Sequence, residues 1–336
     1  MPGIHNRRRF LAGLTATGAV GLIGSPSPAS AEPPPETKTV RLPGYYPAGC
    51  DSPLYIAQEL LLGEGFDDVR LVQGDVSSDT SVWLARGEID FDWHYAAVYV
   101  GSIDAGAPVT VLTGVHSGCL ELIANESVNS VAELRGRRIG VFYANSNPHV
   151  LVTLMTAYIG LDPGKDFQWI TNEKISPKDL FIEGEIDAFL AVPPETQELR
   201  ARKIGHTILD TTVDRPWSQY YCCVLAGHAD YVSKYPVATK RVMRALLKAI
   251  DLCATSPKLA AQQLVDGKFT DRYDTALEIL SGSRYDRWRE FDSEDTMRFY
   301  ALRMQETGLI KMSPQEIIAR GTDWRFLNEL KRELKT

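Results

Sequence analysis

The feature that most constrains the fold is an alternation of strand and helix patterns that occurs twice and then gives way to helical patterns alone. The first series predicts strands at 39–42, 69–72, 89–92 and 109–115 and helices at 54–61, 81–86 and 96–105. The second series predicts strands at 138–142, 167–170, 186–190, 207–209 and 220–225 and helices at 131–136, 145–158, 177–183 and 194–202. Helices follow at 237–255, 257–266, 273–281, 293–307 and 314–335. Such alternation predicts an α/β fold with mostly parallel sheets covered by helices on both faces.

Two α/β units in succession predict two lobes, because about 300 residues exceed the size of one usual compact core. The apolar strands at 119–124 and 220–225 are the natural places for the chain to cross between them. We therefore expect lobe one to comprise 38–120 plus 221–336, and lobe two to comprise 121–220. Two crossing strands act as a hinge, and a small molecule would bind in the cleft between the lobes.

The N-terminus predicts export. Arg7, Arg8 and Arg9 precede an apolar, Gly/Ala-rich run that leads to Ala29-Ser30-Ala31, so residues 1–31 have the three parts of a secretory signal peptide. The paired arginines favour the twin-arginine route, which carries folded proteins, over an ordinary Sec signal. The run is shorter than the roughly 20 residues of a spanning helix. The proline-rich segment 32–37 predicts a flexible leader, and we expect a periplasmic or extracytoplasmic protein.

Composition and charge limit the classes of partner that can be expected. The chain is 44% hydrophobic and 24% charged, with a net charge of -7, and its basic residues form no stripe. Nucleic acids and anionic membrane surfaces are therefore not expected as partners. We expect a monomer without a cofactor. No nucleophile motif or glycine-rich phosphate loop is present, so we expect no enzymatic activity.

The five cysteines are too few and too scattered for a disulfide scaffold. They are Cys50, Cys119, Cys222, Cys223 and Cys253. Cys119 could pair with Cys222 or with Cys223, and buried free thiols are the alternative. A metal ion could also bind Cys119, Cys222 and Cys223 together with His116 and Glu121, but the spacing of these residues matches no familiar ligand pattern. We therefore predict no metal site.

Several segments carry a resemblance to a known family. They are CDSPLYIA at 50–57, EGF at 64–66, GEIDF at 87–91, DAGAPV at 104–109, LRGRRIGV at 134–141 and EGEIDAF at 183–189. With them the chain resembles the nitrate/sulfonate/taurine and thiamine-pyrimidine-precursor type of substrate-binding proteins of ABC importers. The resemblance covers nearly the whole chain after residue 37. The repeated Gly-Glu-Ile-Asp string also has a structural reading, since both acids are expected to be turn residues between a helix and a buried strand.

The resemblance implies a fold and a role. The fold would be the two-lobed periplasmic-binding-protein type II fold, with two crossing hinge strands and a helical C-terminal tail on lobe one. The protein would capture a small anionic organic molecule, such as a sulfonate, an aromatic acid or a pyrimidine, and deliver it to the permease subunits of an ABC importer. Two alternatives are an enzyme similar to the thiamine-pyrimidine synthases, although the clustered cysteines of those enzymes are absent, and an exported binding module that feeds a sensor.

Ligand sites in open α/β sheets lie beyond the carboxyl ends of the strands. Those ends predict loops at 45–55, 92–95, 116–121, 144–149 and 192–195, with the strip 215–220 beside them. The residues that we predict to bind the ligand are Cys50, Asp51, Tyr55, Trp93, His94, His116, Ser146, Asn147, Pro193, Glu195, Trp217, Gln219 and Tyr220. By analogy with the family, Asp92 and Val192 are further candidates. The helices that start near Pro53 and Ser146 would direct backbone N–H groups at an anion. For Trp93, Trp217 and Tyr220 a role as core filler is the alternative.

Overall fold

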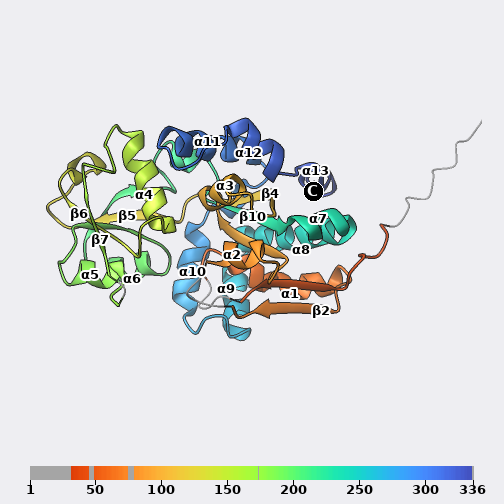
Figure 1. Ribbon diagram of the computed structural model, residues 1–336. Helices are drawn as coiled ribbons and strands as arrows, with labels where there is room; N and C mark the ends of the chain where they lie inside the picture. Colours follow the sequence, from red (N-terminus) through yellow and green to blue (C-terminus); the bar gives the residue numbers. More distant parts are fainter. Residues whose placement is uncertain (1–31, 45–48, 75–78, 173, 335–336) are drawn as a thin grey trace, which may run out of the picture. The chain divides into compact units, whose positions relative to one another are not determined.

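The strands and helices form in nearly the predicted order, with helices around two groups of strands (Figure 1). The computed structural model describes residues 32–44, 49–74, 79–172 and 174–334, and Pro34–Thr336 form one compact unit. The strands are β1 (Thr39–Pro43), β2 (Asp68–Val72), β3 (Phe91–Tyr95), β4 (Val109–His116), β5 (Glu121–Ala124), β6 (Arg138–Val141), β7 (Gln168–Thr171), β8 (Ala188–Ala191), β9 (His206–Asp210) and β10 (Cys223–His228).

Helices connect and cover these strands. They are α1 (Ser52–Gly63), α2 (Thr80–Ala85), α3 (Ala96–Asp104), α4 (Asn147–Tyr158), α5 (Pro177–Ile182), α6 (Glu195–Arg202), α7 (Ala229–Lys234), α8 (Pro236–Thr255), α9 (Pro257–Asp266), α10 (Tyr273–Gly282), α11 (Ser293–Glu306), α12 (Pro314–Gly321) and α13 (Arg325–Glu333). Short 3-10 turns occur at Val131–Leu134, Trp217–Gln219 and Tyr285–Arg287. The predicted helix at 131–136 is thus a single 3-10 turn.

Sheet pairing shows where the prediction of mostly parallel sheets was wrong. One group of strands contains the pair β1-β2 and the sheet β3-β10-β4, and the other is the five-stranded sheet β7-β6-β8-β5-β9. The pairs β1-β2, β6-β7 and β6-β8 are parallel, whereas both neighbours of β10 and both neighbours of β5 are antiparallel. The physical reason is that β5 and β10 directly follow the two connections between the groups, and each is inserted between strands of the opposite direction.

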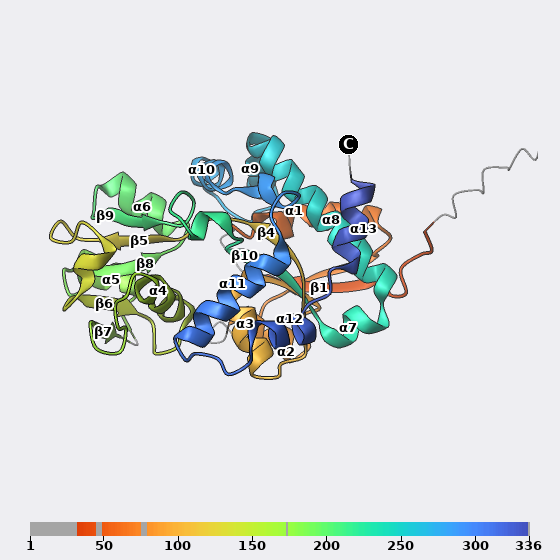
Figure 2. The same ribbon diagram turned by 90° about the horizontal axis from the view of Figure 1, so that it is seen from above.

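The chain forms a two-lobed fold in which it passes between the two groups of strands after β4 and returns after β9. Helices α4, α5 and α6 lie around the five-stranded sheet (Figure 1). The helical C-terminal part packs on the other group, since α8 contacts α1 while α11 and α12 contact α3 (Figure 2). Along α8, buried apolar residues such as Val242, Leu246 and Ile250 recur at helical spacing, and this stripe faces the core. The residue limits 120/121 and 220/221 of the lobes stay a prediction.

The last helical segment differs from the prediction. The pattern at 314–335 predicted one helix, but α12 ends at Gly321 and α13 begins at Arg325. A side chain at position 321 would collide with Ile103, and the chain there forms a bridge between Thr322 and Val111 of β4. The amide of Asp323 also donates to the carbonyl of Val111 at 3.0 Å. This contact with the sheet interrupts the helix, and the sequence period alone does not reveal it.

The repeated Gly-Glu-Ile-Asp string has the same structural role twice. The carboxylate of Asp90 accepts hydrogen bonds from the backbone N–H and the guanidinium of Arg41, with an amide distance of 2.7 Å. Asp187 accepts from the backbone N–H of Arg138 at 2.9 Å and from its guanidinium at 2.9 and 3.2 Å. Each acid therefore ties a helix-to-strand turn to a neighbouring strand, as the structural reading predicted.

The predicted signal peptide, residues 1–31, lies outside the described residues. Within the predicted leader, the two carboxylate oxygens of Glu36 accept from the backbone N–H groups of Val237 and Ala238 at 2.9 and 2.8 Å, so this side chain binds the start of α8. A carboxylate at a helix N-terminus is a favourable arrangement.

In the part of the chain that the structure describes, no helix combines the length and the apolar character needed to cross a membrane.

The Asp187 contact generates a stability prediction. Asp187→Asn removes the charge that receives the Arg138 and Asn125 donors, and we expect a loss of about 1.5–3 kcal/mol in the free energy of unfolding, measured by urea denaturation. Hydrogen bonds from Arg138 hold the pKa of Asp187 below its usual 3.8. Its contribution is therefore complete above that pH and is lost as the pH falls. The control is Asp67→Asn at an exposed ion pair, which should change stability by less than about 0.5 kcal/mol.

Candidate functional site

The register of the first sheet explains why several predicted residues meet. Cys223, at the start of β10, lies opposite Tyr95 of β3 on one side and opposite His116 of β4 on the other. Residues directly opposite on neighbouring strands have their side chains on the same face, so these three residues are neighbours. Trp93 is on β3 too, and its ring centroid lies 5.9 Å from that of His116. The ends of β3 and β4 and the start of β10 thus form one cluster of side chains.

A polar network joins this cluster to the N-terminus of α4. The Asp79 carboxylate lies 2.9 Å from His94 Nε2 and accepts a hydrogen bond from Asn147 Nδ2 at 2.7 Å. Asp79 is the N-cap of α2 and also accepts from the backbone N–H of Ser81. His94 and Asn147 were both predicted site residues, and they come from the two different groups of strands. The contact therefore spans the two lobes.

The electrostatics of this network favour a charged imidazole. Burial disfavours the charge on His94, but the carboxylates of Asp79 and Asp92 outweigh burial and raise the pKa of His94 to about 9. Burial acts to raise the pKa of Asp79, yet the contact with His94 lowers it below its usual value. For Asp92, which accepts from the hydroxyls of Tyr99 and Thr80 at 2.6 and 3.1 Å, burial raises the pKa. The raised pKa favours an ion pair of His94 with Asp79 at neutral pH, whereas the backbone N–H of Tyr95, 2.7 Å from His94 Nδ1, favours the neutral ring with its proton on Nε2.

Three predicted residues present buried polar atoms without a protein partner. Trp93 Nε1, both ring nitrogens of His116 and Ser146 Oγ form no hydrogen bond with any described residue. These residues are 6%, 0% and 3% exposed. Asp92 Oδ1 shares this property. Because buried polar groups are normally hydrogen-bonded, such a gathering at adjacent loops indicates a place where another molecule supplies the partners.

The loop before α1 contributes the next predicted residues. Asp51 accepts from the Tyr55 hydroxyl at 2.9 Å and from the backbone N–H of Gly49 at 2.8 Å, and burial raises the pKa of Asp51 to about 7. The Tyr55 ring stacks on Phe269 with 5.0 Å between the centroids. A Cβ at Gly49 would lie 3.4 Å from the Pro193 carbonyl oxygen, so this loop approaches the loop after β8. Two predicted loops from different lobes therefore meet here.

Glu195 lies in the same second-lobe loop at the start of α6. Its carboxylate accepts from the backbone N–H of Val192 at 3.4 Å, and burial raises its pKa. This bond folds the carboxylate back onto its own loop.

The strip at 217–220 lies elsewhere. Trp217 is 3% exposed and packs edge-on against Tyr158 and Phe299, with centroid distances of 5.9 and 5.5 Å. The Tyr220 ring stacks on Phe299 at 3.9 Å, and the side chain of Gln219 is exposed. Their contacts match the role of core fillers, the alternative for the two aromatic residues. Among the described residues, no hydrogen bond or ring contact joins this strip to the other predicted ligand-binding residues. Its role in ligand binding therefore stays a prediction.

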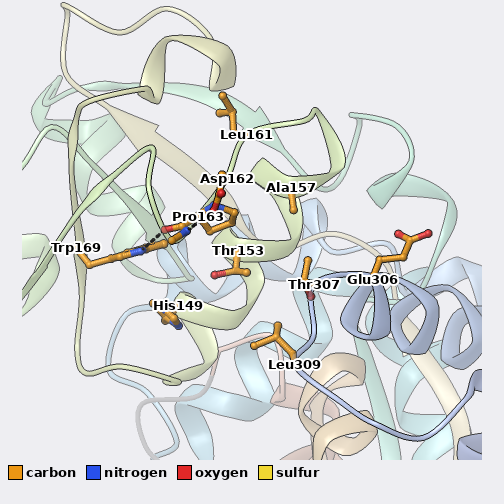
Figure 3. A pocket seen from close by; sticks show the side chains of 11 residues that line it. His149, Thr153, Ala157, Leu161, Asp162, Pro163, Trp169, Glu306, Thr307 and Leu309 are labelled. Carbon is orange, nitrogen blue, oxygen red and sulfur yellow. Dashed lines mark hydrogen bonds between the residues drawn. The ribbon is translucent and has the colours of Figure 1, made fainter.

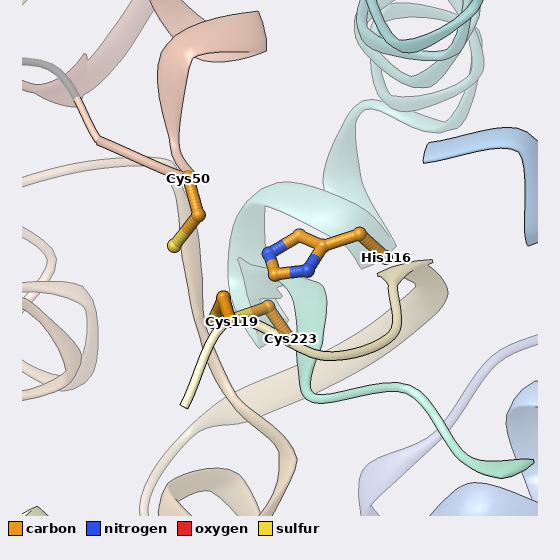
Figure 4. A group of neighbouring side chains, drawn as sticks. All are labelled: Cys50, His116, Cys119 and Cys223. Carbon is orange, nitrogen blue, oxygen red and sulfur yellow. The ribbon is translucent and has the colours of Figure 1, made fainter. Parts of the chain in front are cut away.

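Four potential metal ligands gather beside Trp93, although no metal site was predicted. The thiol–imidazole cluster consists of Cys50, His116, Cys119 and Cys223, and one ligand atom of each lies within 4.8 Å of the others (Figure 4). All five cysteines are free, and the Sγ atoms of Cys119 and Cys222 are 3.4 Å apart. The prediction that Cys119 lies near the vicinal pair therefore agrees with the structure. Sequence spacing alone did not reveal the cluster, because only His116 and Cys119 are close in the chain, and Cys50 and Cys223 come from two other segments.

A surface pocket of about 670 Å³ lies away from this cluster, beside α4 and β7 (Figure 3). His149, Thr153 and Trp169 line it from one side and Glu306 and Leu309 from the other. The Trp169 indole donates to the Pro163 carbonyl at 2.8 Å, which fixes one wall. Of the predicted loops only 144–149 reaches this pocket, through His149. We place the candidate site at the cluster because Trp93, His116 and Asp92 have unpaired buried polar atoms there, whereas Thr153 is the one pocket residue among the described residues that has such an atom.

Sequence reasoning missed Asp79, which joins His94 to Asn147. Its position before the predicted helix at 81–86 is a signal for an N-cap, but nothing local indicates that its second oxygen reaches another lobe. Cys119 and Cys223 were considered as disulfide partners and, with His116, as metal ligands of unfamiliar spacing, but Cys50 was not considered with them. In Cys119 the backbone angle φ is +99°, which is unusual for a residue with a side chain.

Comparison with known proteins places the chain in a family. The model of the family described as NMT1/THI5 like matches residues 52–260, and the chain belongs to that family. The bicarbonate-binding protein CmpA of Synechococcus elongatus is 24% identical over 298 residues, which cover 74% of this chain. The chain spans 65% of the length of that curated relative.

Solved structures show the fold. The periplasmic nitrate-binding protein NrtA from Synechocystis PCC 6803 superposes with a TM-score of 0.74 at 15% identity, covering 90% of each chain. The periplasmic aliphatic sulphonate binding protein SsuA from Escherichia coli gives a TM-score of 0.64 at 16% identity, covering 84% of this chain and 92% of that one. The chain therefore has the periplasmic-binding-protein fold that its sequence resemblance implied.

The Asp79–His94 pair can be tested by its titration. Asp79→Asn removes the carboxylate that stabilises the imidazolium, so we expect the His94 midpoint to fall from about 9 toward or below the ordinary 6.5, measured by NMR of labelled histidine. Because the folded pKa is raised, the pair contributes stability that is complete below pH 6.5 and is lost as the pH rises through about 9. The exposed Asp67→Asn variant should leave the midpoint in place. An unchanged midpoint in Asp79→Asn would contradict the assignment.

Proposed function

We propose that this protein is an extracytoplasmic solute-binding protein that holds a small anionic organic molecule between its lobes and delivers it to an ABC importer. The observation that carries the proposal is the set of buried, unpartnered polar atoms of Trp93, His116 and Ser146 at loops of both lobes. Fold and family support it, since relatives with this fold are named as binding proteins for bicarbonate, nitrate and sulphonate, which are all anions.

The chemistry of the site is compatible with an acid that has an aromatic or other flat part. The N-cap residue Ser146 makes no side-chain capping hydrogen bond to the first turn of α4, and His94 Nε2 lies 3.5 Å from Asn147 Nδ2 in that turn. A helix N-terminus and a nearby cation both favour an anionic group. The buried ring of Trp93 offers a flat apolar surface and an indole donor. Asp79 and Asp92 oppose an anion, but each is already engaged by hydrogen-bond donors.

Capture would proceed by a shift between open and closed arrangements of the lobes. A molecule that contacts both lobes binds the closed form more tightly and moves the equilibrium by that difference. The Asn147–Asp79 hydrogen bond and the approach of Gly49 to Pro193 are contacts that opening would break. Handing the molecule to permease subunits would then require reopening.

The closure is testable by small-angle scattering. Thermal-shift screening of sulfonates, aromatic acids and pyrimidines identifies a molecule that raises the melting temperature, because binding to the native state stabilises it. With that molecule at saturation we expect a smaller radius of gyration than without it. A radius of gyration that stays the same at saturation would contradict the proposed closure of the two lobes.

Ser146 allows a sharper test of the site. Its hydroxyl makes no capping hydrogen bond, so Ser146→Ala should leave stability unchanged but weaken binding of the identified molecule about 10-fold, measured by calorimetry. The matched control is Ser176→Ala at the start of α5, where the hydroxyl does accept from the Asp179 amide. There we expect a stability loss of about 1 kcal/mol and unchanged binding. The opposite pattern would place the ligand elsewhere.

The thiol–imidazole cluster favours one alternative, an enzyme similar to the thiamine-pyrimidine synthases. Mass spectrometry of the identified molecule after incubation with the protein separates the two, because a binding protein returns it unchanged. A sensor module would bind the same molecule, and adjacent permease and ATPase genes would favour the importer.

A further inference from the structure

The thiol–imidazole cluster has the chemistry of a metal site. Three sulfur atoms and one imidazole come from three segments: the loop before α1, the end of β4 with the residues directly after it, and the start of β10 (Figure 4). Three cysteines with one histidine are a ligand set of structural zinc sites. Thiolates also select copper(I) over harder cations. Oxygen-preferring ions such as Mg²⁺ are excluded by the same preference.

The imidazole supplies an independent indication of a ligand. His116 is 0% exposed, and neither of its ring nitrogens has a hydrogen-bond partner among the described residues. A neutral imidazole has one donor and one acceptor, and both are normally satisfied when buried. In Figure 4 its ring points toward the three cysteines, with Cys50 beside it and Cys119 and Cys223 below it. A metal ion among the sulfurs would bind one of these nitrogens.

The fold holds the ligands at the required separation. Cys223 is the cross-strand partner of His116, so the sheet itself fixes two of the four. In a tetrahedron with metal–sulfur bonds of about 2.3 Å, sulfur atoms are about 3.8 Å apart. Ligand atoms that now lie up to 4.8 Å apart would therefore have to approach each other by up to about 1 Å on metal binding. The positive φ of Cys119, which follows Gly118 with φ +80°, turns its side chain toward the cluster.

We propose that the thiol–imidazole cluster binds one thiophilic metal ion, zinc or copper(I), at the point where the chain leaves and re-enters the first lobe. This goes beyond the proposed solute capture and does not depend on it. One ion would tie the loop before α1 to both connections between the lobes. It would also keep three thiols from oxidation in the compartment that the export prediction implies.

A disulfide between Cys119 and Cys222 is the competing arrangement, since their sulfurs are 3.4 Å apart. That bond would take Cys119 away from the metal, so the two states exclude each other. Cys222 therefore gives a discriminating variant. Cys222→Ser abolishes the competing disulfide and leaves all four proposed ligands in place.

The test is metal binding by the chain without its signal peptide, purified under reducing, oxygen-free conditions. We expect one zinc or copper(I) ion per chain by elemental analysis and equilibrium dialysis, with Mg²⁺ as a non-binding comparison. Cobalt(II) in the same site should give thiolate-to-metal charge-transfer absorption and the intense visible bands of a tetrahedral complex. Dialysis against zinc chloride and against chelator-buffered copper(I) decides between the two ions.

Ligand variants assign the site. Cys119→Ser and His116→Asn should each weaken binding by more than about 100-fold, beyond the loss typical of residues that only support a ligand. Cys222→Ser and Cys253→Ser should bind as the wild type does, since Cys253 is buried in α8 outside the cluster. If a ligand variant fails to fold, the thiolate intensity of the wild-type cobalt spectrum still reports the number of sulfur ligands.

Several results would overturn the proposal. They are folded, reduced wild type that binds no metal in stoichiometric amount, a cobalt spectrum without thiolate bands, equal losses in Cys119→Ser and Cys253→Ser, and a Cys119–Cys222 disulfide that persists in protein isolated without oxidant. Both proposals use His116, but the solute-binding test acts on Ser146, outside the cluster, and the metal assays contain no organic solute. Failure of the two proposals can therefore be told apart.

Discussion

The site depends on the insertion of β10 between β3 and β4. This strand comes back from the other lobe and pairs antiparallel with both neighbours, so its first residue, Cys223, meets Tyr95 and His116 at once. Backbone hydrogen bonds on both sides leave the strand no freedom to slide, because a one-residue slip would turn its buried side chains to the other face. The return of the chain thus places the ends of β3 and β4 and the two connections between lobes around one small volume.

The two lobes share one local arrangement at the turn that leads from a helix into a buried strand. In each, an aspartate after Gly-Glu-Ile binds the backbone and guanidinium of an arginine on a neighbouring strand. The glycines at 87 and 184 have φ of +69° and +77°, a conformation that glycine adopts without steric cost. These ion pairs therefore hold the strand ends that lie opposite the candidate site.

At the other ends of these strands, where the candidate site lies, buried polar groups lower the stability of the protein. The residues there retain buried polar atoms without protein partners, which lowers stability unless another molecule completes them. The Asp79–His94–Asn147 network is the exception, because it is satisfied within the protein and joins the lobes directly. One part of the site thus holds the lobes together, while the neighbouring part has unmet hydrogen-bonding capacity. That combination is what a reversible closure around a guest requires.

The sequence by itself determined the order of the elements, the two-lobed architecture and the loops that contain the site, because hydrophobic periodicity and turn residues are local properties. Trp93, His94, His116 and Asn147 were predicted this way from their places after strands, and their role in binding stays a prediction. Tertiary structure alone decided the antiparallel insertion of β5 and β10, the break between α12 and α13 at β4, and the bond from Asp79 to the other lobe. It also decided which cysteines meet, since strand register brings Cys223 to the imidazole of His116, and the loop before α1 brings Cys50 there from a distant part of the chain.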